Sequence, residues 1–139
     1  DPKVQKFFEA FDRRKVPYKI GFDSCTSAAL VNFSKRFDAR YIDYCEGARF
    51  SMYIDARLNA MACSFLNGRK EHHRRLNPDT GYGIKEAWNS EEFCRFRKKL
   101  KTACPACSKR SQCGGGCPIA SSVTLCKSGQ RTTKGEELI

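Results

Sequence analysis

Five cysteines in the C-terminal third of the 139-residue chain have the spacing of metal ligands. Two, five, three and eight residues separate successive members, which are Cys104, Cys107, Cys113, Cys117 and Cys126. Cysteines two residues apart can bind one metal centre, because the backbone between them turns tightly and directs N–H groups toward the sulfurs. Glycine, which fills positions 114–116, adopts positive-φ conformations cheaply and lets the backbone approach a cluster closely. We therefore expect this segment to bind a metal centre through thiolates.

Disulfides and structural zinc are the alternatives to iron–sulfur ligation. Nine cysteines are an odd number, and several lie too close together in sequence to pair with their neighbours. Cysteine pairs also form zinc knuckles, but the loop between such pairs is usually longer than the five residues between Cys107 and Cys113. Pro118 directly follows a cysteine, as in bacterial ferredoxins. The spacing favours an iron–sulfur centre in a reducing compartment, which predicts a cytoplasmic protein.

The first 44 residues have the pattern of an α/β unit. Apolar side chains at helical spacing predict a helix over residues 3–14 (Val4, Phe7, Phe8 and Phe11). Alternation of apolar and polar residues predicts a short strand over 18–22, and a second helix is expected over Ser27–Lys35. Cys25 follows the predicted strand, and ligand-bearing residues commonly stand at strand ends in α/β folds.

A β-hairpin is predicted between residues 50 and 65. Its first strand ends at Ile54, its turn covers residues 55–58, and its second strand begins at Asn59. Cys45 precedes the first strand and Cys63 stands near the end of the second. Because the open ends of a hairpin come together, we expect these two thiols to lie in one neighbourhood.

The rest of the chain is expected to contain one helix between irregular segments. Residues 68–83 are polar and basic, which predicts a mobile loop in which His72 and His73 are solvated and bind no metal. A helix capped by Asn89 or Ser90 should extend to Leu100, with its buried face marked by Phe93, Phe96 and Leu100. Residues 103–126 are too rich in cysteine and glycine for regular structure, and the last dozen residues are expected to fray.

The cysteine order resembles the signature of the SPASM domain, the C-terminal extension of many radical SAM enzymes such as sulfatase-maturating and peptide-maturase enzymes. Cys45 and Cys63 precede the x2/x5/x3 run, and Cys126 follows it. The segment from Ile84 to Phe93 also resembles the helix that precedes the run in that family. The resemblance covers residues 45–126 and implies a small α+β fold with a hairpin, a helix and cluster-binding loops. Residues 1–44 resemble the end of a radical SAM barrel, and residues 127–139 would form a tail.

The resemblance implies two auxiliary [4Fe-4S] clusters. By position, the second cluster would be bound by Cys104, Cys107, Cys113 and Cys126. The first would be bound by Cys45, Cys63 and Cys117, with Cys25 as the candidate for a fourth ligand that usually comes from an upstream cysteine. If Cys25 is not a ligand, that iron is open to substrate or solvent.

Two positions depart from the family pattern. The family has glycine at the position that four residues separate from the second cysteine, where this chain has Leu58, so the turn either avoids the glycine conformation or is strained. Cys94 has no place in the signature and is expected to be a buried or half-buried free thiol on the helix.

Charge and length leave a second class of function open. The formal net charge is +11, which suits acidic partners including nucleic acid. Eight thiolates binding two clusters would lower it to about +7, so part of the excess can balance cluster charge. The aromatic residues follow helix and strand periods instead of forming a base-stacking platform, so nucleic acid is disfavoured. No stretch has the length of a membrane span. A zinc-stabilised interaction module or a nucleic-acid-binding module remains the alternative.

The expected role is electron transfer and substrate positioning in radical SAM modification of a peptide or protein. The Cys-x3-Cys-x2-Cys motif that binds the S-adenosylmethionine-cleaving cluster does not occur in the sequence. We therefore expect the chain to be part of a larger enzyme, whose radical SAM barrel would carry S-adenosylmethionine and act as its partner. Alone, the chain would not start the radical reaction.

Overall fold

The computed structural model describes residues 2–102 and 104–120, which form a small α+β fold. The chain divides into two compact units, described separately below. The first contains residues up to Cys45 together with the described residues from Thr102 on, and the second contains Glu46–Lys101. No helix among the described residues is long and apolar enough to cross a membrane.

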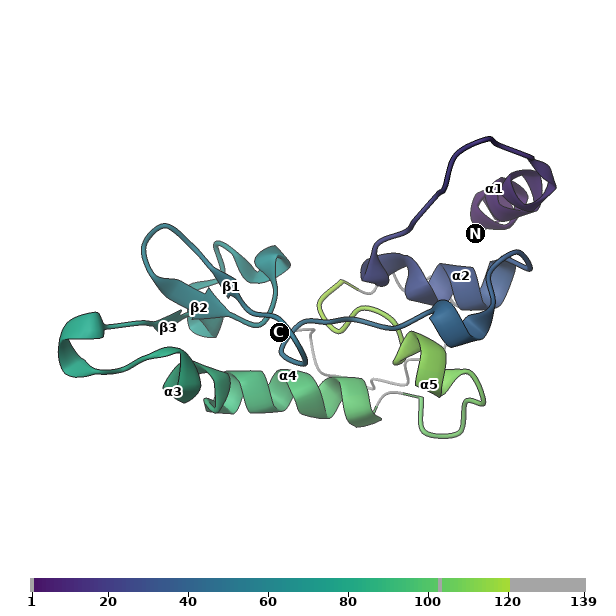
Figure 1. Cartoon of the computed structure of the whole chain (residues 1–139). Coiled ribbons are helices and arrows are strands. Elements are labelled where there is room, and N and C mark those ends of the chain that lie inside the picture. The colour runs from purple at the N-terminus through teal and green to yellow at the C-terminus, as the bar shows by residue number, and fades with distance from the viewer. Residues whose placement is uncertain (1, 103, 121–139) are drawn as a thin grey trace. The chain divides into compact units, whose positions relative to one another are not determined.

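Helices and loops make up the first unit (Figure 1). Its α-helices are α1 (Pro2–Arg13), α2 (Ser27–Phe33) and α5 (Arg110–Cys113), and 3₁₀ turns cover Ser24–Thr26 and Ala39–Tyr41. The spacing of apolar residues predicted α1 correctly. Phe8, one of these residues, is buried against α2. Phe8, Ala29 and Leu30 form the core, and aromatic rings pack around it (Phe11, Phe22, Phe33 and Phe37).

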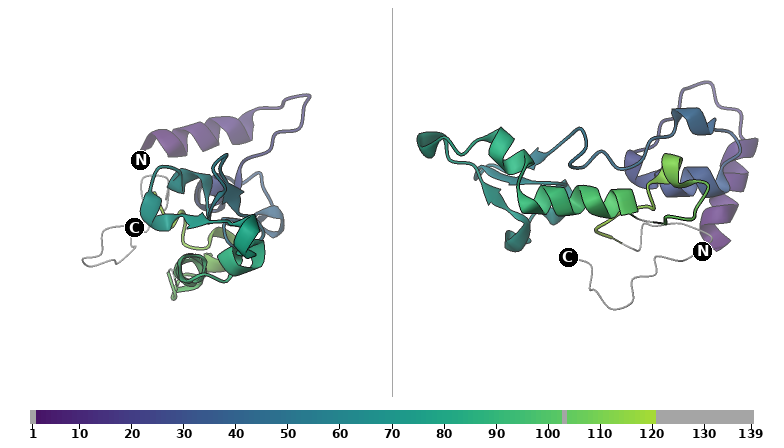
Figure 2. Two further views of the ribbon diagram at one scale, coloured as in Figure 1. Left: turned by 90° about the vertical axis from the view of Figure 1, so that its left-hand side faces the viewer. Right: turned by 90° about the horizontal axis from the view of Figure 1, so that it is seen from below.

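A three-stranded antiparallel sheet and two helices form the second unit (Figure 2). The strands are β1 (Tyr53–Ile54), β2 (Asn59–Met61) and β3 (Arg74–Arg75), and β2 lies between the other two. The helices are α3 (Ile84–Trp88) and α4 (Glu91–Thr102), and 3₁₀ turns cover Ser64–Leu66, Lys70–His72 and Pro78–Thr80. The sheet lies along one side of α4 in Figures 1 and 2.

The hairpin and the buried face of α4 agree with the sequence prediction. Tyr53 pairs with Met61 and Ile54 with Ala60, so the turn lies between residues 54 and 59 as expected. The buried face of α4 contains Phe93, Phe96 and Leu100, and each is at most 2% exposed. Their spacing places them on one side of the helix.

Three predicted segments differ from the structure. Residues 18–22 form no strand, because alternation alone cannot make one without a partner for its backbone hydrogen bonds. Residues 68–83 are not a single irregular loop but contain two 3₁₀ turns and β3, which pairs with β2 through Arg74 opposite Ala60. Residues 103–126 include one helical turn, α5, in their described part. The tail predicted at 127–139 lies outside the described residues.

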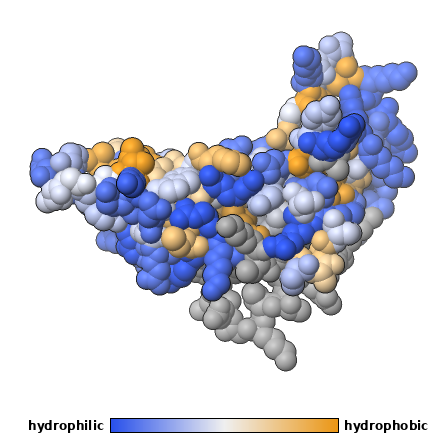
Figure 3. Space-filling view, turned by 60° about the horizontal axis from the view of Figure 1, so that its bottom comes forward, coloured by the Kyte–Doolittle hydropathy of each residue, from blue (hydrophilic) through white to orange (hydrophobic). Residues whose placement is uncertain are grey.

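The surface agrees with the high share of charged residues, 29% of the chain. On the face drawn in Figure 3, hydrophilic residues predominate and apolar residues form small patches between them.

Candidate metal centre

Three consecutive glycines shape the backbone between Cys113 and Cys117. Gly114, Gly115 and Gly116 have φ values of 54°, 79° and 83°, all in the region that glycine enters without strain. α5 ends in this run, where the Gly114 N–H donates to the Arg110 carbonyl (2.8 Å) and the Gly116 N–H donates to the Cys113 carbonyl (2.9 Å). The expected glycine conformation is therefore present.

Both cysteines beside the glycines are buried. Cys113 is 5% exposed and Cys117 is 7% exposed. The Ala120 N–H donates to the Cys117 sulfur at 3.3 Å. A backbone N–H that points at a sulfur stabilises negative charge on it, which suits a thiolate ligand. The loop can therefore hold thiolates away from water.

Cys104 and Cys107 lie in a tight turn ahead of α5. The Cys107 N–H donates to the Cys104 carbonyl at 3.0 Å, and the Arg110 N–H donates to the Cys107 carbonyl at 3.2 Å. Cys104 has a φ of 49°, which is strained for a residue with a side chain. Strained conformations of this kind cluster at functional sites, so this backbone is consistent with a ligand-bearing turn.

Cys25 begins the segment that leads into α2. The Asp23 carboxylate accepts a hydrogen bond from the Cys25 N–H at 2.8 Å and so fixes the 3₁₀ turn that carries the thiol. The pKa of Cys25 is raised to about 12, mostly by burial, then by the Asp23 carboxylate, and last by the negative charges of Cys117 and Cys45. Cys45 and Cys117 thus lie within electrostatic reach of Cys25. Three predicted ligands of the first cluster are gathered in one unit.

Two further contacts hold the cysteine loops against α2. The helix α5 packs beside α2, as Figure 1 shows. The Lys109 ammonium donates to the Val31 carbonyl at 3.2 Å and to the Asn32 side-chain oxygen at 3.3 Å. A cation near the end of α2 also complements the negative end of the helix dipole. Residues almost eighty positions apart in sequence therefore position the loop.

Cys63, Cys94 and Cys126 are the remaining cysteines of the chain. Cys63 follows β2 in the second unit and is half-buried, so its meeting with Cys45 stays a prediction. Cys126 lies outside the described residues. The expected burial of Cys94 is wrong: its thiol is exposed on α4, because a helix turns about 100° per residue and carries it away from the face of Phe93.

The donor set of this site consists of cysteine thiols, the ligand type that binds iron–sulfur clusters. Cys25, Cys94, Cys107 and Cys117 are free thiols. Among residues 2–102 and 104–120, no group of three or more His, Cys, Asp or Glu side chains is placed to hold a single metal ion. Each thiolate of a [4Fe-4S] core binds a different iron atom, so its sulfurs are spread more widely than those around one ion.

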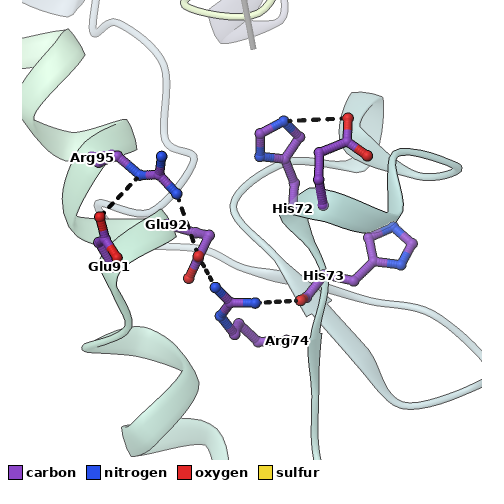
Figure 4. A network of polar contacts seen from close by, with 7 residues as sticks. His72, His73, Arg74, Glu91, Glu92 and Arg95 are labelled. Carbon is purple, nitrogen blue, oxygen red and sulfur yellow. Dashed lines mark hydrogen bonds and ion pairs between the residues drawn. The ribbon is translucent and has the colours of Figure 1, made fainter.

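The basic segment before β3 is more ordered than its sequence indicated (Figure 4). The Arg74 guanidinium forms an ion pair with the Glu92 carboxylate, which also pairs with Arg95 at 3.4 Å. The side chain of Glu92 is only 8% exposed. The His72 side chain is 12% exposed, so its expected solvation is wrong, and burial lowers its pKa. The ion pair of Arg74 with Glu92 attaches β3 to α4.

Comparisons of the chain with family models, with curated proteins and with solved structures find no match.

Proposed function

We propose that this chain binds two [4Fe-4S] clusters as a SPASM-like auxiliary domain. Cys25, Cys45, Cys63 and Cys117 would bind the first cluster, and Cys104, Cys107, Cys113 and Cys126 would bind the second. The clusters would support electron transfer and substrate positioning while a radical SAM barrel of the same cytoplasmic enzyme modifies a peptide or protein.

The observation that carries the proposal is the loop from Cys113 to Cys117. Its three left-handed glycines bring backbone close to two buried sulfurs, and Cys117 accepts an N–H from Ala120. A disulfide needs none of these features. A thiolate that binds a cluster is served by them, because hydrogen bonds to the sulfurs and exclusion of solvent are among the properties that set the potential of a cluster.

The approach of Cys45 and Cys117 to Cys25 supports the ligand set of the first cluster. The pKa of Cys25 is raised mostly by burial, and the charges of Cys117 and Cys45 raise it in the same direction, so thiolates at these positions repel one another. A bound cationic core would offset this repulsion, because a metal stabilises the thiolate form of its cysteine ligands and their protons go to solvent. When bound, the clusters would supply one-electron transfer. The residues of this chain hold the sulfurs, exclude water and direct N–H groups at them.

The test is anaerobic reconstitution with iron and sulfide, followed by measurement of iron and acid-labile sulfide per chain. Two clusters require about eight irons per chain. Four or fewer would contradict the two-cluster proposal. Iron–sulfur clusters give a charge-transfer absorbance band at roughly 400 nm. If the protein binds zinc in place of iron and lacks this band, the zinc-stabilised alternative is supported instead.

A pair of cysteine variants tests the ligand assignment. Cys107→Ala should lower the iron content from about eight to about four, because a [4Fe-4S] cluster needs its cysteine ligands. The matched control is Cys94→Ala, which removes a thiol from the exposed side of α4 and should leave iron content unchanged. Equal iron in both variants would refute the role of Cys107.

A further inference from the structure

The ring of Tyr44 occupies the space in which a side chain at position 114 would lie. A Cβ atom built on Gly114 would stand 2.2 Å from Cδ2 of Tyr44, 2.5 Å from Cγ and 2.9 Å from Cε2. Real Cβ atoms do not come so close to other heavy atoms. Gly114 is therefore required for two reasons, its φ of 54° and the ring that rests on it.

This ring contact lies among the proposed ligands. Gly114 directly follows Cys113, which is buried, and Tyr44 directly precedes Cys45. All of these residues belong to the first unit. Tyr44 as a whole is half-buried, and its ring lies against the backbone at Gly114.

We propose that Tyr44 shields the cluster-binding loop from water and so tunes the reduction potential of the clusters held there. This inference rests on the proposed function. Reduction adds negative charge to a cluster that thiolates already make negative, and water stabilises added charge better than an apolar ring does. Solvent exposure is one of the properties that set iron–sulfur potentials. Tyr44 acts as a positioning residue: it binds no iron itself.

Three variants test this role on the reconstituted full chain. Tyr44→Ala removes the ring, and it should shift the potential of at least one cluster to more positive values and speed bleaching of the iron–sulfur absorbance in air. Tyr44→Phe keeps the ring and should restore both properties to those of the unchanged protein. The matched control is Tyr41→Ala, because Tyr41 is 85% exposed and its loss should change neither property.

A second experiment tests the contact itself. Gly114→Ala should reduce iron loading, because the new methyl group meets the Tyr44 ring. Combining Gly114→Ala with Tyr44→Ala should recover part of the lost iron, although the backbone strain at position 114 remains. Combining Gly114→Ala with Tyr41→Ala should recover none.

The outcomes separate this inference from the proposed function. An unchanged protein that takes up no iron refutes the proposed function. If the unchanged protein loads fully with iron, and Tyr44→Ala has the same reduction potentials and bleaching rate as the unchanged protein, the shielding role alone is overturned. Failure of Tyr44→Ala to rescue Gly114→Ala overturns the contact on which the role depends.

Discussion

Leu58 stands in the hairpin turn at a position where glycine should be more stabilising than alanine. Its φ is 61°, in the left-handed region, and its N–H donates to the Asp55 carbonyl at 3.0 Å. The Asp55 N–H donates to the Asn59 carbonyl at 3.0 Å. The turn between these residues is therefore one residue longer than a two-residue hairpin turn. Hairpins of this kind normally carry glycine at the left-handed position.

The size of the effect follows from two opposing terms. A residue with a Cβ atom costs about 1–2 kcal/mol in the left-handed region. Glycine loses more conformational entropy than alanine on folding, which costs about 0.5–1 kcal/mol. We therefore expect Leu58→Gly to be about 1 kcal/mol more stable than Leu58→Ala. Both variants lose the same leucine side chain, which is 40% exposed, so this loss cancels in the comparison.

The assay is thermal unfolding followed by circular dichroism. In a chain of this size, about 1 kcal/mol corresponds to a difference of about 3–5 °C in Tm. The control pair is Lys98→Gly and Lys98→Ala at an exposed position of α4, where glycine should be the less stable residue by about 1 kcal/mol. Alanine that equals or exceeds glycine in stability at position 58 would refute the left-handed turn.

Three further predictions concern the first cluster, the hairpin and α4. Cys25→Ala should remove iron from the first cluster, and iron content and spectra equal to those of the unchanged protein would exclude Cys25 as a ligand. The pKa of Asp55 is lowered, first by hydrogen bonds from Asn59, so its stabilising effect is present above the ordinary value of 3.8 and lost as the pH falls below it. The free energy of unfolding should be measured from about pH 6 to about pH 2.5, which spans the carboxylate titration range. Over this range it should fall less in Asp55→Asn than in the unchanged protein. Glu92→Gln should destabilise the chain by about 1–2 kcal/mol, because this buried carboxylate pairs with two arginines. The control Glu91→Gln, with a side chain 78% exposed, should change the free energy of unfolding by less than about 0.5 kcal/mol.

Features that depend on neighbours in sequence could be predicted from the sequence. The helical spacing of apolar residues located α1 and the buried face of α4, because burial of one face is what stabilises such helices. The hairpin turn was located by the change from alternating residues to a polar group at Asp55. The conformation of the glycine run was also predictable, because only glycine enters it without strain.

Features that depend on distant partners could not be predicted in this way. The segment 18–22 has the alternation of a strand, but Phe22 packs into the aromatic core of the first unit. β3 consists of two arginines, so it has no apolar pattern from which a strand could be predicted. Pairing with β2 and the ion pair of Arg74 with Glu92 hold it in place. The His72 side chain is largely buried although it stands in a polar, basic run.

The candidate site has the same division between local and distant contributions. Spacing identified the cysteines of the C-terminal run, because two of them share one turn and two flank one glycine run. The electrostatic influence of Cys45 and Cys117 on Cys25 depends on folding of the first unit, and the sequence could name Cys25 only as a candidate. No sequence signal pointed to Tyr44, because an aromatic residue beside a cysteine is equally compatible with core packing.

Leu58 and Cys104 show how the surrounding structure can impose a conformation that the residue type disfavours. At Leu58 the cause is visible: the Asp55 carboxylate accepts hydrogen bonds from the Arg57 N–H and from both the backbone and side chain of Asn59, at 2.8–2.9 Å. These bonds fix the turn on both sides of Leu58, so its strain is offset by its neighbours. For Cys104 the proposed cluster would supply a comparable constraint, because a bound sulfur fixes its own backbone. The strain at Cys104 should therefore matter less in the loaded protein, and Cys104 should be the ligand whose turn loosens first when iron is removed.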